Sequence, residues 1–582
     1  MKKNKYKSII LGVCLLGSMG IPSCSSFESE PLDWVTEDVV TNPQDSTAQY
    51  IKGLFFAIYA QLPDLHNRIQ SSYLDAATDD GLPTKDKGGA SSLNNYRNGG
   101  VSAGNIADLD GDAYAKCYIG IKRANLFMQK LEGFPNSSIG ITETIRKNMI
   151  AEARAVRAYF YFELIKRWGG VPIVYDNVYD MNSNIDIPRN TFDECVNYIL
   201  NEISPDVPTS CYNNLYDAFS SADGTNDGMF GRFNKGSILG LISRMKLYLA
   251  SPLYNTSNDL SKWQRAADAA KRVIGLGIYE LHSSFVDMFG LTSAFPSKEI
   301  IIVKEAALNT TVETNNSPSG YYNSAVKCYG LTSPSQNLVD AFLTLDGKTI
   351  DDPTAKYPYN PQDPYKNRDP RLTNTIFYNG SKWLNREVQT FDGGLDRSKK
   401  PGFYFTLTGY YLRKFLSKSE TASSFGSIRH HNYIMRYAEI LLNYAEAINE
   451  VNGDKSEIES ALIQIRKRAG IEAGTDQRYG LPTIYTQNEM RKIIRNERRI
   501  ELAFEEHRFW DIRRWKIADN GDAVMLKTVR GVVITQATDG TLSYQYVDVA
   551  SSTFDSKMYS YPIPRAELQG NRKLEQNPGW DY

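Results

Sequence analysis

The sequence predicts a mostly α-helical protein, built as an array of paired helices with irregular, loop-rich segments wrapped around it. Two observations support this fold class. Apolar residues recur at helical spacing over several long stretches that glycine or proline ends. These stretches follow one another in pairs, with the length and the Ala, Tyr and Leu content of tetratricopeptide-like units. We expect about four such pairs and only a few short strands, such as the run EIIIVKEA.

The longest predicted helix lies in the stretch TETIRKNMIAEARAVRAYFYFELIKRW. One apolar stripe runs along it, and Gly169, Gly170 and Pro172 end it. The stripe consists of Ile145, Met149, Ala153, Val156, Phe160 and Leu164. The helix pairs are expected near residues 44–131 with 144–168, within 233–275, and within 431–469. Residues 44–582 are expected to form one domain.

Two long segments have no such periodicity. Residues 64–111 and 283–430 are rich in Gly, Asn, Ser, Asp, Pro and Tyr. Long irregular segments in a compact protein usually form functional surface. We therefore expect the ligand site in these two segments.

The N-terminus has the pattern of a secretory signal. Four lysines precede the apolar run from Ile9 to Ile21, which is too short to cross a bilayer as a helix. The run ends in IPSC, which resembles a bacterial lipobox, so residues 1–23 are expected to be removed and Cys24 to be lipidated. The alternative is an ordinary secretory signal with an incidental cysteine. Residues 24–43 would form a polar tether, and the lipid would anchor the protein to the membrane without crossing it.

Composition and motifs exclude several classes of function. A net charge of -1 lacks the basic excess that nucleic-acid binding requires. There is no G-x-S-x-G elbow and no H-E-x-x-H motif, so no cofactor and no catalytic metal are expected. DLDGDAY, from Asp108 to Tyr114, has some features of a calcium loop, but Ile119 stands where the bidentate glutamate belongs, which favours a solvated turn.

Four cysteines remain beyond the signal and the anchor. Their spacing fits neither a zinc motif nor a disulfide scaffold. A bridge between Cys195 and Cys211 is one possibility, and burial of both as free thiols is the other.

Three blocks of the sequence resemble those of the SusD/RagB proteins. They are EARAVRAYFYFELIKRWGGVPIVYD at residues 152–176, IIRNERRIELAFEEHRFWDIRRW at 493–515 and YPIPRAELQGNRKLEQNPGW at 561–580. Residues 334–347 and 364–383 resemble two further blocks, in the same order along the chain. The resemblance implies a non-catalytic surface lipoprotein of the outer membrane. Such a protein would bind a nutrient glycan and pass it to a partner TonB-dependent transporter.

The block at residues 493–515 also has a physical interpretation. Glu497 falls on the same helical stripe as Met490, Ile493, Ile500 and Phe504, so its carboxylate is expected to be buried. A buried carboxylate needs partners. The candidates are Arg498, Arg499, Arg154 and Arg157. The functional alternative, in which Glu497 or Glu501 is a catalytic acid, is less favoured than a structural role.

The resemblance also implies where a ligand would bind. Sugar sites combine aromatic platforms with hydrogen-bonding side chains. The first loop region offers Tyr73, Asp79, Asp80, Asn95, Tyr96, Arg97 and Asn98. The second offers Tyr321, Tyr322, Asn323 and Tyr329. The tryptophan often found near the first region in the family is absent, so Tyr96 or Tyr114 would serve as the platform.

Tyr321 and Tyr322 are the favoured candidates, because consecutive aromatic residues flanked by Ser, Gly and Asn are hard to bury together. Two other functions stay open. One is a RagB-like protein that binds peptides. The other is a secreted glycoside hydrolase, which would need two carboxylates that face each other across a pocket.

Overall fold

The computed structural model describes residues 47–581, apart from residues 67, 85–91, 137–139, 180–182, 184, 219–229, 290–296, 323–326, 398–404, 419 and 521–522. The expected signal peptide 1–23, the lipidation site Cys24, the tether 24–43 and Asn323 lie outside the described residues. Within the described part, no helix combines the length and the apolar character needed to span a membrane.

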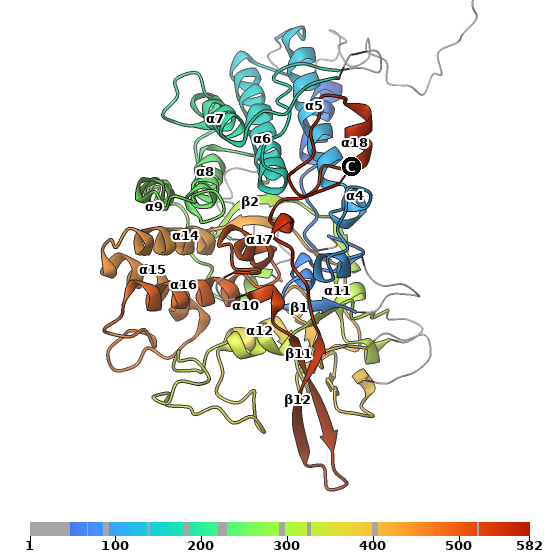
Figure 1. The fold of residues 1–582 in the computed structure, drawn as a ribbon, viewed down its shortest axis with the longest axis vertical. Helices are drawn as coiled ribbons and strands as arrows, with labels where there is room; N and C mark the ends of the chain where they lie inside the picture. Colours follow the sequence, from blue (N-terminus) through green and yellow to red (C-terminus); the bar gives the residue numbers. More distant parts are fainter. Residues whose placement is uncertain are drawn as a thin grey trace, which may run out of the picture.

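The described chain is a mostly helical array of packed helix pairs, as the sequence predicts (Figure 1). α5 (Ala113–Glu132) packs against α6 (Glu143–Trp168), and α2 (Gln49–Tyr59) packs against α5. α8 (Lys235–Ala250) pairs with α9 (Leu260–Ile274), and α14 (Tyr437–Glu450) pairs with α15 (Lys455–Ala469). The array is continuous, because α14 also packs against α9.

Shorter helices connect and cover these pairs. They are α3 (Asn94–Arg97), α4 (Ile106–Leu109), α7 (Phe192–Ile203), α10 (Phe285–Phe289), α11 (Thr311–Asn316), α12 (Gln336–Ala341), α13 (Pro370–Thr375), α16 (Gln487–Glu501), α17 (His507–Arg514) and α18 (Arg565–Gly570). Short 3-10 helices lie at Leu74–Ala77, Cys211–Asn214, Ser319–Tyr321, Leu395–Arg397, Val524–Leu526 and Ser556–Tyr559.

Local side-chain contacts set the helix ends. Thr142 accepts a hydrogen bond from the amide of Ile145 at the start of α6, and Thr486 forms a capping box with Glu489 at the start of α16. Gly169 ends α6 with φ 70°, a backbone conformation that glycine adopts without strain. The predicted end of the longest helix at this glycine is confirmed.

Small residues allow the helices of a pair to approach each other closely. In α5, Gly120 faces the ring of Phe160 in α6, and any side chain at position 120 would overlap that ring. In α9, Ala266, Ala267 and Ala270 are buried in the shared core. These contacts explain why glycine and alanine recur in the paired stretches.

The strands form two-stranded antiparallel pairs throughout the described chain. The pairs are β1 (Gly81–Pro83) with β4 (Thr332–Pro334), β2 (Ile300–Lys304) with β10 (Asn432–Arg436), β3 (Leu308–Asn309) with β9 (Ile428–Arg429), β5 (Ile376–Phe377) with β8 (Tyr411–Leu412), β6 (Lys382–Trp383) with β7 (Arg386–Glu387), and β11 (Val529–Gln536) with β12 (Leu542–Ala550). The strand expected in EIIIVKEA is β2. The long β11–β12 hairpin was not predicted.

The buried apolar residues form two clusters. The larger cluster joins the helix pairs, with Trp168 among its members. The second includes much of segment 283–430, where Phe377, Trp383 and Leu412 are fully buried. This segment is therefore a packed layer with its own core and not only surface loop.

Candidate functional site

The two segments expected to carry the ligand site lie against each other. β1 of the first segment pairs with β4, which directly follows the second candidate region, and Gly81 lies opposite Pro334. The hydroxyl of Ser72 donates to the carbonyl of Leu331 at 3.0 Å, and the amide of Thr84 donates to the same carbonyl at 2.9 Å. Residues some 250 positions apart in sequence thus form one junction, which the sequence could not show directly.

Tyr73, the first predicted contact residue, is buried at this junction. Its hydroxyl lies 2.9 Å from Nδ1 of His66, and its ring stacks on that of Phe415 at 5.2 Å between ring centres. None of its surface is exposed. The expectation of an exposed platform at Tyr73 is corrected, because the side chain completes the second hydrophobic cluster.

Asp79 and Asp80 are buried in ion pairs. Arg508 holds both oxygens of Asp79 at 2.9 and 2.8 Å, and Arg499 bridges Asp79 and Asp80. Burial alone would raise the pKa of Asp79, but Arg499 and Arg508 lower it to about 2. The expectation that Asp79 and Asp80 face a ligand is therefore corrected. Both carboxylates are buried, and their ion pairs join the first loop region to α16 and α17.

Tyr96 and Arg97 also point inward. The ring of Tyr96 meets that of Phe509 edge to face at 5.3 Å. The guanidinium of Arg97 donates to the carbonyl of Thr78 and the hydroxyl of Ser552, each at 2.5 Å. Both side chains are almost completely buried, so the expectation that they face a ligand is corrected. Tyr114, the other proposed platform, is buried as well.

Two further predicted contacts, Asn98 and Tyr322, reach the surface. Asn98 is exposed, and its side-chain oxygen accepts from the amide of Gly100 at 3.1 Å. Tyr322 is half-buried, with its ring centre 6.0 Å from that of Tyr329. The ammonium of Lys327 donates to the Tyr322 hydroxyl at 3.1 Å. The role of Asn98 and Tyr322 as ligand contacts stays a prediction.

Tyr321 differs from its neighbour. Its hydroxyl donates to the carbonyl of Trp383 at 2.5 Å, and the guanidinium of Arg386 lies 3.5 Å from its ring centre. Only 8% of Tyr321 is exposed. The chain avoids burying two consecutive aromatic residues by turning one inward and leaving the other at the surface, so the predicted exposure of Tyr321 is corrected.

A cavity of about 650 Å³ opens in the first loop region, and most of the residues that line it have polar side chains. Asn95, a predicted contact, lines it. Sequence reasoning missed the other hydrogen-bonding residues of this wall as ligand contacts: Gln70, Ser92, Asn105, Asp108, Asp112 and Lys116. Gln70 precedes Ser72 by two residues and Tyr329 precedes Leu331 by two residues, and Ser72 and Leu331 are hydrogen-bonded where the two segments meet. The high amide content of the first loop region was the feature of the sequence that could have indicated these contacts.

Lys116 also lines a second cavity of about 380 Å³. Its interior charges are paired with one another. Arg167 binds both Asp110 and Glu163, and Arg68 binds Asp110 at 2.7 Å. Asp110 is the central acid of the sequence DLDGD. Because its carboxylate is buried between two guanidinium groups, it is neither in a solvated turn nor free to bind a cation. Within the described residues no acidic, histidine or cysteine cluster has a metal-binding arrangement.

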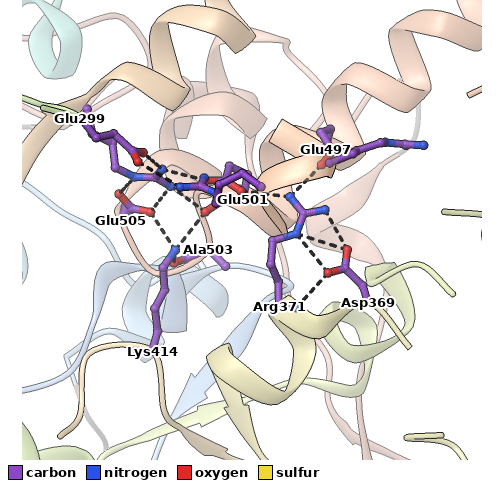
Figure 2. A network of polar contacts seen from close by, with 11 residues as sticks. Glu299, Asp369, Arg371, Lys414, Glu497, Glu501, Ala503 and Glu505 are labelled. Carbon is purple, nitrogen blue, oxygen red and sulfur yellow. Dashed lines mark hydrogen bonds and ion pairs between the residues drawn. The ribbon is translucent and has the colours of Figure 1, made fainter. Parts of the chain in front are cut away.

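The buried charges of α16 form a network (Figure 2). Glu497 is fully buried, as predicted, but its partners are Arg371 at 2.7 Å and Arg466 at 2.8 Å. Arg498 and Arg499, the predicted partners, point elsewhere, because consecutive helical residues do not share a face. Arg154 and Arg157, the other two candidates, bind Glu202 instead.

The network does not present a catalytic acid. Burial alone would raise the pKa of Glu501, but Arg468, Arg436 and Arg371 lower it well below its ordinary value, so the carboxylate stays ionised. Lys414 donates to the carbonyls of Glu501 and Ala503 and to the carboxylate of Glu505. The network instead connects α13, β10, α15 and α16 and fixes their relative positions.

The cysteines are buried and unbridged in the described chain. Cys195 donates weakly to the carbonyl of Val171 at 3.4 Å. Of the two possibilities for Cys195 and Cys211, the structure shows free thiols.

Two family models match the chain. The model described as the SusD family matches residues 298–580, and the model described as starch-binding associating with outer membrane matches residues 73–216. The chain belongs to the SusD/RagB family. The predicted membership is confirmed, and the matched ranges include the blocks on which it rests.

Individual SusD-like relatives agree with this. SusD-like protein P2 of Formosa agariphila is 39% identical over 110 residues, which is 19% of this chain and 22% of that relative. A SusD-like protein of Bacteroides fragilis of known structure is 25% identical, with a TM-score of 0.71 over 92% of this chain and 98% of that one. A laminarin-binding SusD-like protein has the same fold at 20% identity, with a TM-score of 0.62 over 92% of this chain and 100% of that one.

Proposed function

We propose that this protein binds a glycan at the junction of the two loop segments, without cleaving it. The observation that carries the proposal is the cavity of about 650 Å³ in the first loop region, which amide, hydroxyl and carboxylate side chains line. The half-buried rings of Tyr322 and Tyr329 belong to the second segment, which the β1–β4 pair joins to the first. Amides and carboxylates bond the hydroxyl groups of sugars, and aromatic rings cover their apolar faces. The description of the matching family model as starch-binding supports this class of ligand.

The test is isothermal titration of residues 25–582 with starch, laminarin, other polysaccharides and a panel of peptides, followed by an assay for released sugars. Lys116→Ala and Tyr322→Ala are the site variants. The matched controls are Lys467→Ala, on the exposed side of α15, and Tyr175→Ala, which is 55% exposed away from the cavity.

Saturable binding that the site variants weaken and the controls leave unchanged supports the proposal. Released sugars would overturn the proposal that the protein does not cleave the glycan. Binding of peptides in place of every polysaccharide would favour the RagB-like alternative.

We propose further that Cys24 is lipidated and holds the protein at the outer membrane, facing outward. The lipobox-like sequence and the outer-membrane description of the matching family model support this. Metabolic labelling with radioactive palmitate should mark the wild-type protein and not Cys24→Ala. Protease added to intact cells should degrade the anchored protein, and its protection would contradict the outward orientation.

The proposed partner is a TonB-dependent outer-membrane transporter, which would receive the glycan. This proposal rests on the family resemblance. Purification of the tagged full-length chain from detergent-solubilised outer membranes should recover a large barrel protein in near-stoichiometric amount. Recovery of this chain by itself would contradict the partnership.

A further inference from the structure

A third concave site borders α5. It is a groove of about 230 Å³ between α5, the connecting chain at residues 172–179 and 185–187, and the C-terminal segment around α18. α18 lies beside α5 in Figure 1. Its apolar lining includes Tyr118, Tyr179, Ile185, Ile187 and Leu574. Of the ligand contacts that the sequence analysis named, Tyr114 lines this groove.

The walls of the groove are tied together by hydrogen bonds. The hydroxyl of Tyr118 donates to the carbonyl of Pro172 at 2.8 Å, and the amide of Asn571 donates to the carbonyl of Ile187 at 2.7 Å. Arg572 pairs with Asp186 at 2.5 Å across the same boundary. The groove is therefore formed before a ligand arrives, which lowers the entropic cost of binding.

A carboxylate sits at the edge of this apolar lining. Glu567 is half-buried, and no described donor or cation pairs with its carboxylate group. Burial raises the pKa of Glu567, and the nearby negative charge of Asp112 raises it further. A partly desolvated carboxylate without a partner is disposed to accept hydrogen bonds from a ligand. Lys122 and Asn177 add polar groups along the same rim.

The groove and the polar cavity are neighbours. Asp112 lines the cavity and precedes α5, and Tyr114, two residues later, lines the groove. The N-terminal end of α5 therefore borders both the cavity and the groove.

We propose that this groove is a second saccharide subsite, in which Tyr118 and Tyr179 cover a sugar ring and Glu567 accepts its hydroxyl hydrogens. The inference rests on the proposed glycan binding and extends it. The ligand is an oligosaccharide that occupies the cavity and the groove together. The cavity and the groove together are lined by three carboxylates, Asp108, Asp112 and Glu567, and by two ammonium groups, Lys116 and Lys122. Because the net charge of this lining is negative, it repels anionic glycans, and the favoured glycan is neutral.

The experiment compares short and long neutral glycans. Maltose and maltoheptaose, and laminaribiose and laminariheptaose, are titrated into residues 25–582. The groove variants are Tyr179→Ala and Glu567→Gln. Tyr175→Ala is the matched control, since Tyr175 lies at a turn in the same connecting segment, is 55% exposed and does not line the groove.

Loss of one aromatic contact should weaken heptasaccharide binding about tenfold. Disaccharide binding in the cavity should stay unchanged, and the control should match wild type for both lengths. Equal heptasaccharide affinity for Tyr179→Ala and Tyr175→Ala would overturn the proposal that the groove is a saccharide subsite, and it would leave the proposed function intact. Absence of binding to any of the glycans by the wild-type chain would overturn both.

Discussion

Replacement of Arg371 by methionine tests whether the buried charge network holds the fold together. The guanidinium of Arg371 is completely buried. It binds Asp369 at 2.8 Å, Glu497 at 2.7 Å and Glu501 at 3.0 Å. Methionine fills much of the same volume, so the main effect of Arg371→Met is the loss of one positive charge among three carboxylates.

The loss of stability in Arg371→Met comes mainly from Asp369. Glu497 keeps Arg466 as a partner, and Glu501 keeps Arg436 and Arg468. Asp369 has no other cationic partner among the described residues and remains buried as a negative charge. Loss of one partner of a buried ion pair costs about 3–5 kcal/mol, which is a large part of the stability of a typical domain.

The assay is urea unfolding followed by circular dichroism. Arg371→Met should lower the free energy of unfolding by about 3–5 kcal/mol, and the added change Asp369→Asn should recover about 1–2 kcal/mol by removing the stranded charge. Arg572→Met is the matched control. Its ion pair with Asp186 is 83% exposed on the arginine side, so water screens it and the unfolding midpoint should not move. An effect of Arg371→Met no larger than that of the control would refute this account.

Three further predictions concern buried groups. Burial alone would raise the pKa of Glu446, but Arg514 and other neighbouring donors lower it from 4.5 to about 2. The contribution of Glu446 to the stability of the folded state is therefore complete above pH 4.5 and is lost as the pH falls toward 2. Glu446→Gln should therefore flatten the fall in stability over that range, measured by thermal unfolding, and an unchanged slope would contradict the ion pair. Tyr321→Phe should lose about 1 kcal/mol of stability with its hydrogen bond to Trp383 and leave glycan affinity unchanged, whereas weaker binding would return Tyr321 to the site. The four described cysteines are Cys117, Cys195, Cys211 and Cys328, and they should react with a thiol reagent only after unfolding. Two reactive thiols in place of four would indicate a disulfide.

The sequence by itself determined the helical array, several helix ends and the burial of Glu497. These features depend on local relations. A stripe of apolar residues three and four positions apart defines the buried face of a helix, and a capping residue acts within three positions of the end. The family could also be recognised, because its blocks are contiguous stretches in a constant order.

The tertiary structure alone decided the direction of each loop side chain. Tyr321 and Tyr322 have the same composition around them, yet one bonds Trp383 and the other reaches the surface. The partners of Glu497 come from α13 and α15, and no spacing rule connects those helices with α16. The cavity and the groove likewise arise where distant segments meet, and the packing of those segments determines which polar groups remain free for a ligand.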